Sequence, residues 1–291
     1  MGPILVFGAG GQLGRELVSR ADRLDIQLGA IAHAEADIAD SEAVIRSIAR
    51  LSPSLVVNAA AYTKVDAAES EPEAAFRSNA TGPAVLAATC ATAGVPLIHI
   101  STDYVFDGAK PIAYLEEDAI APLGVYGRSK AAGEAAIRAR LTEHVILRTS
   151  WVYGEYGANF LKTIIRLACE CDELRIVADQ RGCPTATIDI AQAILTIAPR
   201  LVRREPVWGT YHFVGTGATT WYGFAVEIVQ AQARSTSRCP RVVPITTAEC
   251  HASARRPINS ELNCSRFAAT FGFQAEDWHV RTLEVTAALL R

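Results

Sequence analysis

The sequence predicts an α/β fold in which a doubly wound parallel sheet is followed by a smaller C-terminal lobe. Three observations point to it: short apolar runs typical of strands buried on both faces, helical patterns between these runs, and a glycine-rich turn directly after the first run. The 291 residues suffice for one large domain or two closely joined ones. We place the boundary near residue 150, so that 1–150 form the first domain and 151–291 mainly the second lobe.

The first strand and its turn predict a Rossmann-type dinucleotide site. The apolar run Ile4–Phe7 is followed at once by Gly8, Gly11 and Gly14, and a helical pattern then begins. Gly8 permits the tight turn, Gly11 lets the backbone approach a pyrophosphate, and Gly14 lets the helix pack on the strand. The first amides of that helix would bind the phosphates. The same glycines also suit a turn that binds nothing.

The end of the second strand leaves the choice of cofactor open. An NAD-specific site usually has an acid there to bind the ribose 2′-hydroxyl, but Ala32 and His33 occupy the place and Glu35 lies slightly beyond. The sequence therefore allows NADPH or NADH. Asp37 and Ile38 resemble the pair that flanks adenine in this fold, with Asp37 bonded to the exocyclic amine. The alternative for Asp37 is a helix cap.

Two further strands bring small and polar residues to the ligand side, because ligands of open α/β sheets bind at the carboxyl ends of the strands. Ala61, Tyr62 and Thr63 end one of these strands or follow it, and Thr102 and Asp103 follow the other. We expect strands at 27–32, 55–61 and 95–100 and a helix at 41–51.

Tyr126 and Lys130 suggest acid–base catalysis. Their spacing of four residues places them on one face of a helix that continues through 131–141. A tyrosine with a pKa near ~10 is a poor catalyst at neutral pH, and a nearby ammonium lowers that pKa. Thr102 could hold the same substrate oxygen as Tyr126. The alternatives are a strand-end cap for Thr102 and an ordinary packed tyrosine for Tyr126.

Segments along nearly the whole chain carry a family resemblance and are more specific than the glycine turn. They are 57–66, 68–72, 101–106, 122–127, 148–153, 179–180, 184–185, 219–222 and 255–260. In these segments the chain resembles the extended short-chain dehydrogenases/reductases and, more narrowly, the family of dTDP-4-dehydrorhamnose reductases.

This resemblance implies hydride transfer from NADPH or NADH to C4 of dTDP-4-dehydro-L-rhamnose, giving dTDP-L-rhamnose. Tyr126 would protonate the developing alkoxide, Lys130 would lower the tyrosine pKa and bind the ribose, and Thr102 would orient the substrate. Asp103 and Trp151 match substrate contacts of the family. The matching cofactor contacts, beside the glycines, are Gln12, Leu13, Asp37, Ile38, Ala61, Tyr62 and Thr63.

We assign no metal site from the sequence. Some members of the family are reported to form dimers bridged by Mg²⁺, and only Glu16 lies near one such place. A homodimer and bound Mg²⁺ are therefore expectations that depend on the resemblance alone. Cys169 and Cys171 have no further cluster of metal ligands beside them.

The C-terminal part is expected to form most of the substrate-binding lobe. Arg255 and Arg256 suit the substrate diphosphate, because arginine forms paired charge-assisted bonds to phosphate oxygens; the alternative is a solvated surface pair. Trp151 either closes over the sugar or base or packs in the core. Trp221 is expected to pack at the start of a helix, outside the site. A strand expected at 209–215 indicates that the chain returns to the first domain.

Two other functions stay open beside reduction of this keto sugar. Another nucleotide-sugar ketoreductase, epimerase or dehydratase is the nearest rival, but dehydratases commonly have Asp-Glu after the threonine, where this chain has Asp103 and Tyr104. A cofactor-binding regulator resembling the methionine adenosyltransferase β subunit would not need the catalytic residues. The presence of Thr102, Tyr126 and Lys130 favours a reductase.

Charge and composition exclude several classes of protein. The 28 basic and 31 acidic residues give a net charge of -3, which provides no general attraction to nucleic acid or an anionic membrane. No stretch is typical of a signal peptide or a membrane span. Seven cysteines, an odd number in a chain of this length, indicate reduced thiols. We therefore expect a cytoplasmic protein.

Overall fold

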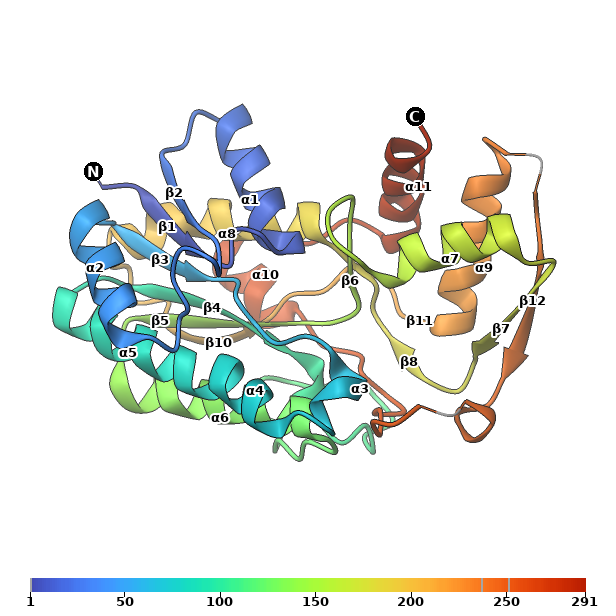
Figure 1. Cartoon of the computed structure of the whole chain (residues 1–291), viewed down its shortest axis with the longest axis horizontal. Coiled ribbons are helices and arrows are strands. Elements are labelled where there is room, and N and C mark those ends of the chain that lie inside the picture. The colour runs from blue at the N-terminus through green and yellow to red at the C-terminus, as the bar shows by residue number, and fades with distance from the viewer. Residues whose placement is uncertain (1, 237, 251) are drawn as a thin grey trace.

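A six-stranded sheet and a smaller lobe lie side by side in the computed structural model, which describes residues 2–236, 238–250 and 252–291 (Figure 1). All strands of the sheet are parallel, in the order β10-β5-β4-β3-β1-β2. The predicted α/β fold with a parallel sheet is thus confirmed. The strands are β1 (Ile4–Phe7), β2 (Leu28–Ile31), β3 (Leu55–Asn58), β4 (Leu97–Thr102), β5 (His144–Thr149) and β10 (Gly209–His212).

Most strand positions follow the apolar runs, but several ends differ from the prediction. The strand expected at 55–61 ends at Asn58, because its side-chain oxygen accepts the N–H of Ala60 and the chain leaves the sheet there. The strand expected at 95–100 begins at Leu97 and continues to Thr102, which still pairs with Thr149 of β5. The strands β2 and β10 are also shorter than expected.

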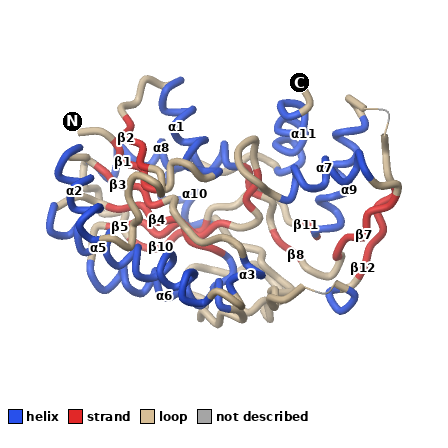
Figure 2. The backbone as a smooth tube through the Cα atoms, viewed as in Figure 1, coloured by secondary structure: helices blue, strands red, loops and turns tan. Residues whose placement is uncertain are grey.

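Helices cover both faces of the sheet (Figure 2). On one face lie α1 (Gln12–Arg23), α8 (Thr187–Val202) and α10 (Ser265–Phe271), and on the other α2 (Ser41–Leu51), α5 (Gly82–Ala93) and α6 (Val125–Arg140). Helix α2 has the predicted bounds, and Asp40 caps it by accepting the N–H groups of Glu42 and Ala43. Before α5 come α3 (Val65–Ala68), α4 (Pro72–Phe76) and a π-helical turn η1 (Arg77–Thr81).

The smaller lobe has an apolar core of its own, built around α7 (Phe160–Glu170), α9 (Trp221–Ala233) and α11 (Trp278–Leu289). Trp221 begins α9, as predicted, and Thr220 caps the helix by accepting the N–H of Gly223. Short strand pairs complete the lobe: β6 (Val152–Tyr153) with β9 (Thr185–Ala186), β7 (Glu173–Val177) with β12 (Arg241–Ile245), and β8 (Arg181–Gly182) with β11 (Thr219–Thr220).

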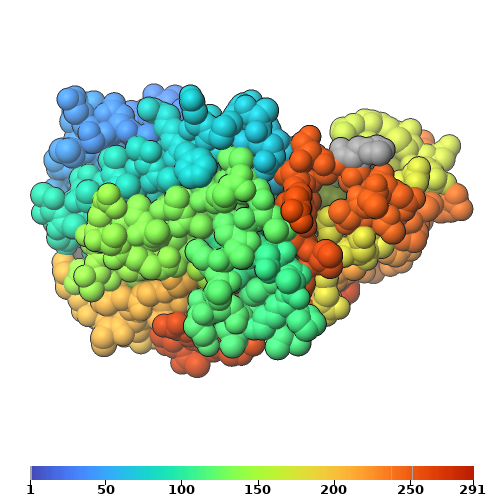
Figure 3. Space-filling view, turned by 90° about the horizontal axis from the view of Figure 1, so that it is seen from below, coloured from blue at the N-terminus to red at the C-terminus, as the bar shows by residue number. Residues whose placement is uncertain are grey.

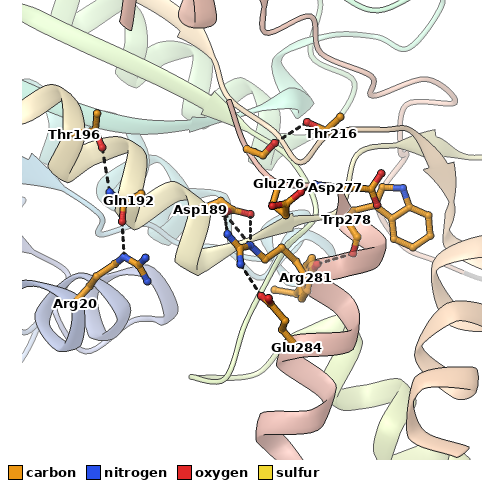
Figure 4. A network of polar contacts seen from close by, with 12 residues as sticks. Arg20, Asp189, Gln192, Thr196, Thr216, Glu276, Asp277, Trp278, Arg281 and Glu284 are labelled. Atoms are coloured by element: carbon orange, nitrogen blue, oxygen red, sulfur yellow. Dashed lines mark hydrogen bonds and ion pairs between the residues drawn. The ribbon is translucent and has the colours of Figure 1, made fainter. Parts of the chain in front are cut away.

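Helix α8 joins the two lobes. Figure 4 shows Gln192 of this helix accepting from Arg20 of α1 at 2.9 Å, while Asp189 in its first turn forms a forked ion pair with Arg281 of α11 at 2.7 Å. Because β10 is a strand of the sheet and α8 packs on one of its faces, segments after residue 150 return to the first lobe. The boundary near residue 150 stays a prediction.

Two findings bear on the classes of protein considered from the sequence. Among the described residues, none of the helices combines the length and the apolar character that crossing a bilayer requires. All seven cysteines have free thiols.

Candidate active site

The glycine turn after β1 has the shape that the sequence predicts. Gly8 has a φ of +84°, and a Cβ there would lie 2.4 Å from the backbone nitrogen of Ala60. A Cβ at Gly14 would lie 2.2 Å from the carbonyl oxygen of Gly8, so α1 packs directly on the turn. Gly11 precedes α1 and provides no side-chain cap, which leaves the helix N-terminus suited to an anion. These features fit a dinucleotide pyrophosphate.

The side chains of Leu13 and Ile38 are turned away from this turn. Leu13 is buried in the core between α1 and the sheet, and Ile38 packs in the core on the other face, close to Gly82. A contact between Ile38 and an adenine ring stays a prediction.

Asp37 lies beyond β2 and is paired with a cation. Its carboxylate accepts from Arg77 at 2.7 Å and from the N–H of Ala39 at 2.9 Å. Burial raises the pKa of Asp37, but these two donors outweigh burial and hold the pKa below its ordinary value. The alternative of a cap on α2 is wrong, since Asp40 has that role.

The loop 59–63 is held in place by Asn79, a buried residue of η1 that the sequence analysis did not single out. Asn79 accepts the N–H of Tyr62 at 2.8 Å and donates to the Tyr62 carbonyl at 3.0 Å and to the Ser129 hydroxyl of α6 at 3.0 Å. Ala61 and Thr63 remain exposed beside it. A backbone that faces the glycine turn is thereby fixed to the helix that carries Tyr126 and Lys130.

Gln12 and Glu16 of α1 contact the smaller lobe. The Gln12 side chain accepts from Asn159 at 3.0 Å, and that of Glu16 accepts from the Thr187 hydroxyl at 3.3 Å. Within the described ranges no three His, Cys, Asp or Glu side chains are grouped as metal ligands. The structure therefore provides no support for Mg²⁺ at Glu16.

Thr102, Asp103 and Tyr126 meet at the carboxyl end of β4. The Thr102 hydroxyl donates to Asp103 Oδ1 at 2.9 Å, whereas Asp103 Oδ2 has no hydrogen-bond partner among the described residues. Burial raises the pKa of Asp103 to about 6. Burial also raises the pKa of Tyr126 to about 12, the Thr102 hydroxyl lowers it, and the Asp103 charge raises it. Tyr126 thus holds its proton at neutral pH and suits a proton donor.

Lys130 lies one turn further along α6, as predicted, but its ammonium group has other partners than expected. Its Nζ donates to the carbonyl of Ile100 at 2.6 Å and lies 3.4 Å from Nε2 of His99. Burial lowers the pKa of Lys130 to about 8, opposed by the charge of Glu134. The predicted lowering of the Tyr126 pKa by Lys130 is not seen in this arrangement.

A buried ion cluster fixes α6 against β4 and β5. Glu134, one turn after Lys130, accepts from Arg148 at 2.8 and 2.9 Å and from the Ser101 hydroxyl at 2.6 Å. Glu134 and Arg148 are 0% and 2% exposed. Because Ser101 immediately precedes Thr102, the cluster fixes the distance between the end of β4 and the helix that carries Tyr126 and Lys130.

A groove of about 610 Å³ runs between the two lobes. Figure 3 shows red-orange chain from beyond residue 251 between the larger body and the smaller lobe. Arg256 forms a forked pair with Asp66 of α3 at 2.7 and 3.2 Å, whereas Arg255 is exposed and has no carboxylate partner in the described part of the chain. The groove is lined by residues of both lobes, including Tyr104, Phe160, Arg175, Trp221, Arg255 and Arg256.

Trp151 and Trp221 of the smaller lobe stack on each other. Their rings stack at 3.6 Å and 8°, with Trp151 behind Trp221 and against Gly182. Trp221 lines the groove, and Trp151 is not among its lining residues. The expectation that Trp221 lies outside the site is thus not supported, although its place at the start of α9 is confirmed. Periodicity alone cannot tell which indole faces the groove.

Several known proteins that are similar to this chain are named dTDP-4-dehydrorhamnose reductase. A family model described as the RmlD substrate binding domain matches residues 1–290. The dTDP-4-dehydrorhamnose reductase of Sinorhizobium fredii is 44% identical over 289 residues, which are 99% of this chain and 97% of that protein. A solved dTDP-4-dehydrorhamnose reductase of Clostridium acetobutylicum has a TM-score of 0.92 at 36% identity and covers 99% of this chain and 100% of its own. The Bacillus anthracis enzyme, solved in complex with NADP, has a TM-score of 0.92 at 33% identity and covers 99% of each chain.

Proposed function

The chain belongs to the family of dTDP-4-dehydrorhamnose reductases, and on this premise we propose that it reduces the C4 keto group of dTDP-4-dehydro-L-rhamnose with NADPH or NADH. The observation that carries the proposal is the position of Thr102 at the carboxyl end of β4, with Tyr126 and Lys130 on one face of the adjacent helix α6, at the sheet edge where the glycine turn also lies. A nicotinamide cofactor bound at this edge supplies the hydride. The product is dTDP-L-rhamnose.

The cofactor is held mainly by backbone groups. The uncapped N-terminus of α1, after Gly11, binds the pyrophosphate through its N–H groups. Asp37 faces the adenosine end and the loop 61–63 lines the path toward the reaction centre. Lys130, which donates to the Ile100 carbonyl in this structure, would bind the ribose hydroxyls.

The proton comes from Tyr126. As negative charge develops on the C4 oxygen of the sugar, the Tyr126 hydroxyl donates its proton, and the Thr102 hydroxyl holds the same oxygen. The positive charge of Lys130 stabilises the phenolate that remains. Asp103, whose Oδ2 is unpartnered in the described chain, accepts from a sugar hydroxyl.

The groove receives the nucleotide part of the substrate. Arg255 binds the diphosphate, because it is the arginine of the predicted pair that is not engaged by a carboxylate. Arg256 forms an ion pair with Asp66 and thereby positions the segment that carries Arg255. Trp221, supported from behind by Trp151, offers a flat apolar surface to the base.

The location and assembly of the enzyme are part of this proposal. A reductase that takes a nucleotide sugar and a nicotinamide cofactor from solution works in the cytoplasm. The homodimer expected from the resemblance stays a prediction.

Product analysis tests the reaction. The protein is incubated with enzymatically generated dTDP-4-dehydro-L-rhamnose and either cofactor, and the product is identified by NMR. We expect one NADPH or NADH consumed for each dTDP-L-rhamnose formed. Conversion without net cofactor consumption would indicate an epimerase, and cofactor binding without any turnover would indicate a regulator.

A conservative variant tests the role of Tyr126. Tyr126→Phe removes the proton donor but keeps the ring, so turnover should fall by ~10²–10⁴-fold while the dissociation constant of the cofactor changes little. A turnover number close to that of the unmodified enzyme would refute the assigned role.

A further inference from the structure

A chain of buried polar groups leads from the backbone after β3 to Lys130. Asn58, the last residue of β3, and His99 in β4 are both 0% exposed. Asn58 Nδ2 lies 2.9 Å from His99 Nδ1, and His99 Nε2 lies 3.4 Å from Lys130 Nζ. Neither residue lines the groove. Their burial behind the lysine makes them part of its surroundings rather than of the ligand-binding surface.

The backbone decides which end of the Asn58 amide faces His99. Asn58 Oδ1 accepts the N–H of Ala60 at 3.1 Å, so the amide NH₂ points to the imidazole. Since an amide NH₂ only donates, His99 Nδ1 is an acceptor and carries no proton. Burial, together with the charges of Lys130 and Arg138 and with His144, holds the pKa of His99 well below its ordinary value. The imidazole is therefore neutral, with its one proton on Nε2.

This tautomer has a consequence for the lysine. The Nε2–H group points at Lys130 Nζ, and an ammonium group has only donors to offer it. A neutral amine accepts from Nε2–H with its lone pair and still donates to the Ile100 carbonyl at 2.6 Å. Glu134 on the same helix acts in the opposite direction, because its negative charge favours the ammonium form.

We propose that Asn58 and His99 are positioning residues for the reaction: they fix the tautomer that presents Nε2–H to Lys130 and thereby favour its neutral form before the cofactor binds. The inference rests on the proposed function only in that Lys130 takes part in catalysis. On this proposal Lys130 is not a permanent cation: it loses its proton readily near neutral pH before the cofactor binds and gains one when it binds the ribose.

The tautomer is measured directly by ¹⁵N NMR of histidine-labelled protein, with His99→Asn to identify the signal. We expect neutral His99 with the proton on Nε2 throughout the range of about pH 6 to 9. A proton on Nδ1, or an imidazolium within this range, would overturn the proposal. This measurement needs neither substrate nor cofactor, so it stands even if the protein proves not to reduce the sugar.

A variant tests the effect on Lys130. Asn58→Ala removes the donor to Nδ1, which lets the proton move there and leaves Nε2 free to accept from the ammonium. The chain has only four lysines, so ¹³C labelling of lysine Cε, with Lys130→Met for assignment, follows the titration of this one group. The midpoint, expected at about 8 in the unmodified protein, should rise by about one pH unit in Asn58→Ala, the scale of one exchanged hydrogen bond to a charge.

Gln232→Ala is the matched control. It removes another fully buried amide, in α9 of the smaller lobe, where Gln232 donates to Cys169 Sγ at 3.1 Å. It should lower stability without moving the midpoint of Lys130. If Asn58→Ala lowers stability but leaves both the tautomer and the midpoint unchanged, Asn58 is purely structural and the proposal is wrong. If Asn58→Ala does not fold, the tautomer in the unmodified protein decides the question.

Discussion

Glu134→Gln is predicted to destabilise the protein more than an ordinary surface change, because it leaves a buried arginine without its counter-charge. The two oxygens of Glu134 receive hydrogen bonds from Arg148, Arg138 and Ser101, at distances between 2.6 and 2.9 Å. A glutamine presents an NH₂ group to at least one of these donors and provides no charge to Arg148. Loss of one partner of a buried ion pair costs about 3–5 kcal/mol, a large part of the ~5–15 kcal/mol that stabilises a typical domain.

The effect should depend on pH in a defined direction. Burial alone would raise the pKa of Glu134, but the hydrogen bonds and charges of Arg148, with Ser101 and Arg138, bring it below its ordinary value. A carboxyl group with a lowered pKa in the folded state stabilises the fold above its unfolded pKa, near ~4.3, and this contribution is lost as the pH falls through the folded value. The difference between the two proteins should thus be largest near pH 7 and shrink below about pH 4.

Urea unfolding followed by circular dichroism at several pH values measures this difference. Glu170→Gln is the control, because Glu170 pairs with Arg166 at the surface, where the two side chains are 52% and 60% exposed. It should cost no more than ~0.5 kcal/mol. A loss below about 1 kcal/mol for Glu134→Gln at pH 7, or a loss that grows as the pH falls, would refute the electrostatic reasoning.

Three further predictions concern the site itself. Lys130→Met should weaken both cofactor binding and turnover, and an effect on neither in titration and kinetic assays would contradict its proposed role. Burial raises the pKa of Asp103 to about 6, so the free energy of unfolding falls as the pH rises through that value and the buried group ionises. Urea unfolding should therefore show Asp103→Asn to be more stable than the unmodified protein by about 1–3 kcal/mol at pH 8 and by little at pH 4. Arg255→Ala should raise the KM for the sugar nucleotide about 10–100-fold with little change in Tm. Arg256→Ala, which leaves Asp66 unpaired, should raise the KM and also lower the Tm. Equal effects of the two variants on KM and Tm would contradict these separate roles.

Elements whose conformation depends on residues close to them in the sequence could be predicted from the sequence. The strand β1, the turn at Gly8 and the helix α1 follow one another as expected, and α2 has the predicted bounds. The spacing of Tyr126 and Lys130 needed only the helical period to place both on one face of α6. The same short-range logic placed Trp221 at the start of α9.

Strand ends and side-chain burial were less predictable. The runs 55–61 and 95–100 mark β3 and β4, but the end of each strand depends on what its neighbour offers for pairing. Ile38 is apolar enough for either a base or the core, and only the approach of α5 places it in the core beside Gly82.

The sequence by itself determined the type of fold, the glycine turn and which residues are proposed for catalysis, because these follow from local periodicity and short spacings. Only the tertiary structure decided which partners those residues have. Asp66 and Arg256 are separated by 190 positions in the chain, and His99 meets Lys130 only because β4 packs against α6. Such contacts depend on how distant elements pack, and the proton state of Lys130 depends on them in turn, because charge and hydrogen bonding in a buried site are set by every element that surrounds it.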